Sequence, residues 1–224
     1  MKVKELVSEP QIICVVGDVN SAKSNLLYHV IEEFKREGNF NLYTYGLKNR
    51  IKYATEIFSV NELEQIRNSI IIIDELNSLW DLEERRNKKM IEKTLRLIHH
   101  NNNVLIICAL PENLKKFICG KINKYFFKQC TISDFINGSK AKAVCTDYKG
   151  IEAGTNILSL KKGEAIYFNG IHYSKMKVPY LSRYDTKKGN PNILTRIQKK
   201  NVLKSVKKNV QENVQEKVKI SGFT

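Results

Sequence analysis

The feature of this sequence that most constrains its fold is a short loop, GDVNSAKS, at residues 17–24. It fits the pattern GxxxxGK[ST] except that Ala22 replaces the second glycine. An apolar run, residues 11–16, precedes the loop and is typical of a buried strand, and residues 24–36 carry apolar side chains at helical spacing. A strand, a loop of this pattern and a helix, in that order, predict a phosphate-binding loop (P-loop) in an α/β fold.

The chemistry of such a loop assigns roles to its residues. The backbone N–H groups cradle phosphates at the positive end of the following helix. Lys23 is expected to reach the β- and γ-phosphates, and Ser24 to ligate Mg²⁺ through its hydroxyl. If the backbone of Ala22 needs a positive φ, alanine costs about 1 kcal/mol there. We therefore predict that ATP binds to Gly17, Asp18, Val19, Asn20, Ser21, Ala22, Lys23, Ser24 and Asn25.

A second motif is an acidic pair that follows the β-branched run SIIII at residues 69–73. This run is typical of a central parallel strand. Asp74 and Glu75 come directly after it. We expect Asp74 to join Ser24 in holding the magnesium ion, and Glu75 to orient or deprotonate the attacking water. The predicted catalytic residues are therefore Glu75 and Lys23.

The remaining patterns alternate between strands and helices. Strands are predicted at residues 41–45, 104–110 and 125–131, and helices at 60–68, 81–100 and 112–119. Residues 141–145 and 164–169 are expected to form a last pair of strands, antiparallel, at one edge. Together these elements predict a mainly parallel sheet flanked by helices.

The chain is strongly basic, with 38 Lys and Arg against 23 Asp and Glu and a net charge of +15. Such an excess favours a polyanionic partner, because phosphate contacts release counterions, and double-stranded DNA is the expected one. Composition changes near Tyr184, which predicts an ATPase domain over residues 1–184 and a basic tail over residues 185–224, helical or disordered. Valines recur every four residues along that tail, from Val202 to Val218, so it is either a DNA arm or a docking helix.

Cysteine spacing and hydropathy argue against a zinc-binding, a secreted and a membrane-spanning protein. The five cysteines show no zinc-binding spacing and are expected to be reduced thiols, with Cys14 and Cys108 buried in strands. No secretion signal and no apolar run long enough to span a bilayer is present, so we expect a cytoplasmic protein, in the host cytoplasm if the protein is viral.

The P-loop, the IIIIDE strand, a helix ending in His99 and His100, and the VLIICALPE strand together resemble the FtsK/HerA superfamily, and more closely the small genome-packaging ATPases of viruses. The resemblance covers roughly residues 11–169. It implies an ATP-driven motor that moves DNA, a ring-shaped homo-oligomer, and a viral capsid or transfer-apparatus protein as a further partner. It also implies an arginine supplied by the neighbouring subunit, for which Arg85, Arg86 and Arg96 are candidates.

Two departures from that family leave an alternative open. Ala22 replaces a glycine, and the strand after the acidic pair ends in Cys108-Ala109-Leu110, where the family usually has a glutamine. Both favour an ATP-binding switch or assembly protein with weak hydrolysis. A filamentous-phage type of assembly ATPase and a small-molecule kinase are weaker options, since the chain has neither a membrane segment nor arginines between residues 132 and 163.

Overall fold

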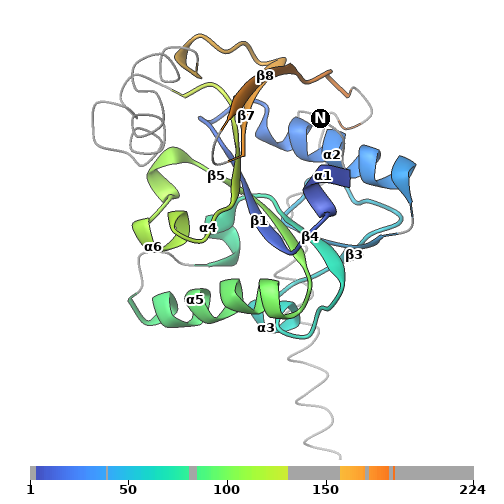
Figure 1. Cartoon of the computed structure of the whole chain (residues 1–224), viewed down its shortest axis with the longest axis vertical. Coiled ribbons are helices and arrows are strands. Elements are labelled where there is room, and N and C mark those ends of the chain that lie inside the picture. The colour runs from blue at the N-terminus through green and yellow to red at the C-terminus, as the bar shows by residue number, and fades with distance from the viewer. Residues whose placement is uncertain are drawn as a thin grey trace, which may run out of the picture. The chain divides into compact units, whose positions relative to one another are not determined.

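The computed structural model describes residues 4–38, 40–80, 85–130, 157–169, 172–181 and 184, and its centre is a mixed sheet (Figure 1). Within these ranges the sheet has eight strands in the order β3-β2-β4-β5-β1-β6-β7-β8. The strands β3, β2, β4, β5, β1 and β6 are mutually parallel. They span Thr55–Glu56 (β3), Asn41–Tyr45 (β2), Ser69–Ile73 (β4), Val104–Ala109 (β5), Gln11–Val16 (β1) and Lys124–Phe127 (β6).

The central strands are apolar because both of their faces are covered. All residues of β1, β4 and β5 are buried. Their register places Ile13 opposite Ile106, and Ile71 opposite Leu105. Strands buried on both faces read as continuous hydrophobic runs, which is why these three were predictable from the sequence.

Helices cover the two faces of this sheet. Helix α2 (Lys23–Glu37) packs Leu27, Ile31 and Phe34 into one core, together with alternate residues of the central strands. Helix α5 (Arg85–His100) buries Ile91, Leu95 and Ile98 and contacts β1 and β5. These two helices match the predicted ones closely, and α2 ends where expected, with the Gly38 N–H donating to Phe34 O.

The predicted antiparallel edge exists, and β7 confirms one of the two strands expected there, whereas β8 was not expected. Strand β7 (Glu164–Phe168) pairs antiparallel with β6 on one side and with β8 (Tyr173–Lys177) on the other. The expected partner segment, residues 141–145, lies outside the described residues. Strand β8 was missed because its residues are only half-buried or exposed, so their sequence carries little hydrophobic alternation.

Several shorter elements also depart from the sequence prediction. The helix expected over 60–68 is limited to α3 (Val60–Leu63), and the one expected over 112–119 is split into a 3-10 turn (Pro111–Asn113) and α6 (Lys116–Cys119). Two short helices, α1 (Lys4–Val7) and α4 (Leu76–Leu79), were not predicted. Four-residue helices carry too little periodicity to be recognised without their tertiary contacts.

The structure confirms the predicted fold class: a mainly parallel sheet with flanking helices and an antiparallel edge. No helix among the described residues combines the length and the hydropathy needed to cross a membrane. The predicted tail, residues 185–224, lies outside the described residues, so the domain boundary at 184 stays a prediction.

Candidate functional site

The GDVNSAKS loop connects β1 to α2 at the carboxyl edge of the parallel strands. A glycine is required at its first position, because a Cβ on Gly17 would lie 2.6 Å from Lys128 Cβ and 2.8 Å from Ser21 Oγ. The loop is also tied to the segment after β6, since the Asp18 N–H donates to Gln129 O at 2.9 Å. Gly17 therefore allows the loop to turn back tightly against its neighbouring strand.

Ala22 has the left-handed conformation that the missing glycine would adopt without strain. Its φ is 66° and its ψ is 38°, and Asn20 in the same loop has a φ of 63°. Asparagine tolerates this region, whereas alanine meets a steric penalty between Cβ and the following carbonyl of about 1–2 kcal/mol. Alanine in place of glycine at this position therefore adds backbone strain where α2 begins.

Replacing Ala22 by glycine should relieve this strain. We expect Ala22→Gly to raise the free energy of unfolding by about 0.5–1 kcal/mol, after the higher entropy of glycine in the unfolded chain is subtracted, and to leave ATP affinity at least as high. Urea unfolding and calorimetric titration with ATP measure the two quantities. Ala54→Gly is the control, because Ala54 has no positive φ and its replacement should destabilise the protein. A loss of ATP binding in Ala22→Gly would mean that the alanine methyl is part of the site.

Lys23 closes over the loop. Its Nζ donates to the carbonyl oxygens of Gly17 and Asp18, each at 2.7 Å. The ammonium group therefore lies against the backbone of the loop that it is predicted to serve. Within the same loop, the hydroxyl of Ser21 is buried and has no hydrogen-bond partner among the described residues. An unpaired hydroxyl and an ammonium group in one loop fit an incoming phosphate.

Ser24 and Asp74 meet, although fifty residues separate them in the sequence. The Ser24 hydroxyl donates to Asp74 Oδ2 at 2.7 Å. Strand β5 lies between β1 and β4, so this bond crosses the carboxyl edge of the sheet in front of β5. A hydroxyl beside a carboxylate is a donor set that suits Mg²⁺, which prefers oxygen ligands. The pair predicted to bind metal is thus brought together.

The environment of Asp74 disfavours its charge. Burial raises the pKa of the carboxyl to about 6, and Glu75 adds to this, while hydrogen bonds from Ser24 and Cys108 and the charge of Lys23 oppose the rise. A buried carboxylate that is held ready for a cation should have a raised pKa of this kind until a cation arrives.

Glu75 follows as an exposed residue with a φ of 65° and a ψ of 88°. A glutamate seldom adopts this region without a tertiary cause, and such residues concentrate at functional sites. The backbone turns sharply here, so that Asp74 is directed into the protein and Glu75 toward solvent. This arrangement fits the predicted division of roles between a metal ligand and a residue that contacts water.

Two further residues were not assigned to the site from the sequence. The buried Cys108 thiol lies close enough to Asp74 to affect its pKa, at the strand end where the family that the sequence resembles has a glutamine, and burial raises the pKa of Cys108 well above its ordinary value. Lys128 is fully buried, and its Nζ donates to Lys162 O and Glu164 O, each at 2.6 Å. Burial lowers the pKa of Lys128 to about 8, against the opposing effect of Glu164. Lys128 thus ties the strand beside the P-loop to the turn before β7.

Asn25 is at the site but uses its side chain elsewhere. Its Nδ2 donates to Pro179 O at 2.9 Å, and its Oδ1 accepts from the Leu181 N–H at 3.0 Å. The predicted contact of Asn25 with a nucleotide therefore falls to its backbone. Trp80, directly after α4, is buried and packs in the core.

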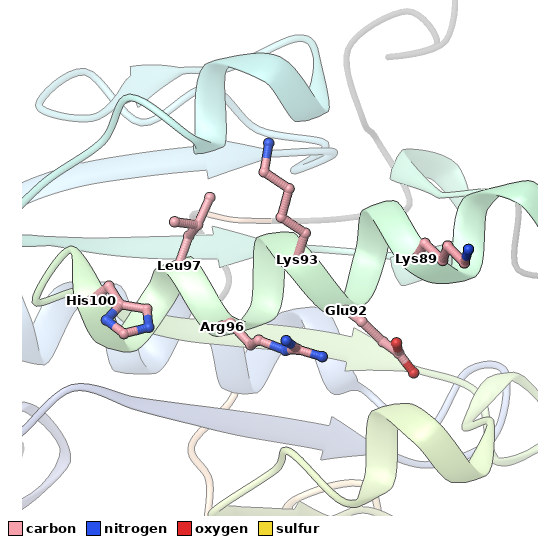
Figure 2. Close-up of a pocket in the computed structure, with 6 residues that line it drawn as sticks. All are labelled: Lys89, Glu92, Lys93, Arg96, Leu97 and His100. Carbon is pink, nitrogen blue, oxygen red and sulfur yellow. The ribbon is translucent and has the colours of Figure 1, made fainter.

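The candidate arginines lie along α5. Arg85 and Arg86 begin this helix. Arg96 lies eleven residues later, about 16 Å along the axis, near the end that leads into the amino edge of the sheet. Figure 2 shows Arg96 and Glu92 extending from the same side of α5, and Lys93 from another side, where it forms an ion pair with Glu64 at 3.0 Å.

These side chains border a hollow of about 490 Å³ on α5, lined by Lys89, Glu92, Lys93, Arg96, Leu97 and His100. Two carboxylates, Glu92 and Glu64, offset its positive charge, and it does not include any residue of the P-loop. The hollow is therefore distinct from the candidate nucleotide site.

Comparison with known proteins places this geometry in context. No family model matches the sequence, and no curated protein does. Among solved structures, B204, the DNA-packaging ATPase of Sulfolobus turreted icosahedral virus, is similar with a TM-score of 0.58 at 12% identity, over 77% of this chain and 99% of that one. The chain has the fold of a viral genome-packaging ATPase.

Other structures with the packaging-ATPase fold agree with this. B204 of Sulfolobus turreted icosahedral virus 2, in complex with ATP-gammaS, has a TM-score of 0.59 at 16% identity, over 76% of this chain and 98% of that one. The pCW3 conjugation coupling protein TcpA, also with ATPgS, has a TM-score of 0.56 at 15% identity, over 87% of this chain and 66% of that one. The similarity inferred from the sequence motifs is thus confirmed at the level of the fold.

Proposed function

We propose that this chain is a P-loop ATPase that translocates double-stranded DNA, in genome packaging or in the transfer of a mobile element, as a ring-shaped homo-oligomer. The single observation that carries the proposal is the Ser24–Asp74 hydrogen bond, which places both predicted magnesium ligands next to the loop lysine. The similar structures include genome-packaging ATPases and a conjugation coupling protein, three of them with an ATP analogue bound. The charge of +15 adds a reason for DNA as the partner.

Each residue of the site would have a separate role in binding and hydrolysing ATP. The backbone N–H groups of the loop, at the amino end of the 15-residue helix α2, bind the phosphates. Lys23 exchanges its two backbone carbonyl partners for phosphate oxygens, which form stronger charge-assisted bonds. Ser24 and Asp74 hold Mg²⁺, which when bound neutralises charge on the phosphates. Glu75, exposed at the same edge, orients the attacking water and takes its proton.

An ATP-dependent switch or assembly protein with slow turnover is the second candidate. Two observations favour it: the strained backbone of Ala22, and Cys108 at the strand end where a glutamine is absent. The buried Cys108 thiol, whose pKa is raised, is a weak hydrogen-bond donor. It could not bind a γ-phosphate oxygen as strongly as the amide of a glutamine would.

The two candidates are separated by the rate of ATP hydrolysis with and without double-stranded DNA. A motor should hydrolyse ATP faster when DNA is added. A switch should bind ATP with little turnover in either condition. Light scattering in the presence of ATP tests for the ring, and absence of any assembly larger than a monomer would contradict the motor.

The basic tail gives a further prediction. Residues 185–224 contain many lysines, and Tyr184, the last described residue, packs against α2, so truncation after Tyr184 keeps that contact. We expect the truncated protein to bind ATP as before but to bind DNA more weakly, with a shallower dependence of affinity on salt, because phosphate-neutralising charges are lost. DNA titrations at several salt concentrations measure both. An unchanged salt dependence with a smaller assembly would instead identify the tail as a docking helix between subunits.

A further inference from the structure

An exposed aromatic side chain lies beside the P-loop, and neither the fold nor the proposed hydrolysis uses it. Tyr180 is 65% exposed. Among the large hydrophobic side chains of the described residues, only Val19 of the P-loop itself is as exposed, at 68%, whereas Phe40 and Tyr53 are each at 39%. One of the two most exposed large hydrophobic side chains of the described residues thus belongs to the P-loop, and the other, Tyr180, lies between two residues whose backbone is bonded to Asn25.

The position of Tyr180 is set by Asn25. The Asn25 amide bonds to Pro179 O and to the Leu181 N–H, as a neighbouring strand would, so it holds the backbone on both sides of Tyr180. Asn25 is the third residue of α2 and directly follows Ser24. The backbone of Tyr180 is thus fixed at the first turn of the helix that points at the predicted phosphates.

Contacts on both sides keep this segment from moving away. Before Tyr180, Val178 is buried, and its N–H donates to Gly163 O at 2.8 Å. After it, the ring of Tyr184 stacks on Tyr28 with centroids 4.3 Å apart, and its hydroxyl donates to the buried Glu32. Asn25, Tyr28 and Glu32 lie at spacings of three and four residues and so share one face of α2. Pro179, Leu181 and Tyr184 therefore all lie against this face of the helix.

When a triphosphate occupies the loop, the nucleoside attached to its α-phosphate lies outside the loop, near the amino end of α2. Bases stack on aromatic side chains with a substantial gain in affinity, and the gain needs no hydrogen bond to the base. We propose that Tyr180 is the platform on which the base of the bound nucleotide stacks. This inference rests on the proposed binding of a nucleoside triphosphate to the P-loop. Since stacking depends on ring area, the site should prefer purine over pyrimidine triphosphates and discriminate little between ATP and GTP.

The test compares a ligand that has a base with one that lacks it. Wild-type protein and Tyr180→Ala are titrated calorimetrically with MgATP and with magnesium tripolyphosphate. We expect Tyr180→Ala to weaken ATP binding about tenfold and to leave tripolyphosphate affinity unchanged. Tyr180→Phe, which keeps the ring, should retain ATP affinity. Phe40→Ala is the matched control, because Phe40 is an exposed aromatic residue that packs on Phe34, near the other end of α2.

The outcomes separate this inference from the proposed function. Unchanged ATP affinity in Tyr180→Ala would overturn the stacking role while leaving the P-loop assignment intact. Equal losses for ATP and tripolyphosphate would also overturn it, since they would mean that the segment shapes the loop and does not contact the base. If wild-type protein binds neither ligand, the proposed function itself fails. Thermal unfolding of each variant checks that the exposed substitution leaves the fold unchanged.

Discussion

Lys23→Ala should abolish nucleotide binding or weaken it by at least about 100-fold. Each hydrogen bond to a charged group contributes about 1.5–3 kcal/mol, and Lys23 is expected to contact two phosphates. The fold should persist, because in the absence of ligand the Nζ bonds only to the carbonyls of Gly17 and Asp18. Losing these two bonds, which lie in a loop and not in the core, should lower the free energy of unfolding without preventing folding.

Calorimetric titration with MgATP and urea unfolding measure the two effects of Lys23→Ala. Lys35→Ala is the matched control, since it removes a positive charge from the last turn of the same helix. The control should bind ATP like the wild type. A folded Lys23→Ala protein with undiminished ATP affinity would count decisively against a P-loop.

The neighbouring carboxylates should give opposite results when each is replaced by its amide. Glu75→Gln is expected to keep ATP binding and to lose hydrolysis by about 100- to 10,000-fold, as for removal of a general base. Asp74→Asn should instead lose the magnesium-dependent part of ATP binding, because an amide oxygen carries no charge for the cation. Similar, mild effects of both substitutions would contradict this division of roles.

Asp74→Asn should also make the metal-free protein more stable at neutral pH. The pKa of Asp74 is raised from 3.8 to about 6, so its charge at pH 7 costs on the order of 2–3 kcal/mol in the folded state. Folding binds a proton between these two pKa values. Stability from this group is therefore full below pH 4 and is lost as the pH rises through 6.

Magnesium should reverse the pH effect, because the cation favours the ionised carboxylate. We expect the affinity for Mg²⁺ with ATP to fall as the pH is lowered through about 6, where Asp74 becomes protonated. Urea unfolding with EDTA across pH 4–8, for wild type and Asp74→Asn, isolates the contribution of Asp74. Parallel stability profiles for the two proteins would show that Asp74 is ionised without cost.

Local sequence patterns predicted the elements that form the edge of the sheet where the candidate site lies. The runs at β1, β4 and β5 are apolar at every position because each strand is covered on both faces, and this needs no knowledge of their neighbours. The P-loop is recognisable because phosphate binding restricts a contiguous stretch of backbone. The short α4 and the polar strand β8 were missed because their formation depends on contacts with distant residues.

By itself, the sequence determined the buried strands and the two long helices, in their order along the chain, and the residue types that suit a phosphate and a cation. Only the tertiary structure gave the contacts between these residues and the backbone conformations that allow them. Parallel strands end at one edge of a sheet, and this brings Asp74 to Ser24 across β5 and places the Cys108 thiol against the same carboxylate. The tertiary structure also set the positive φ of Ala22. It brought Tyr180, 155 residues beyond Asn25, to the first turn of α2. Contacts between residues so far apart in the sequence depend on the free energy of the whole packed chain. No local pattern of residues predicts them.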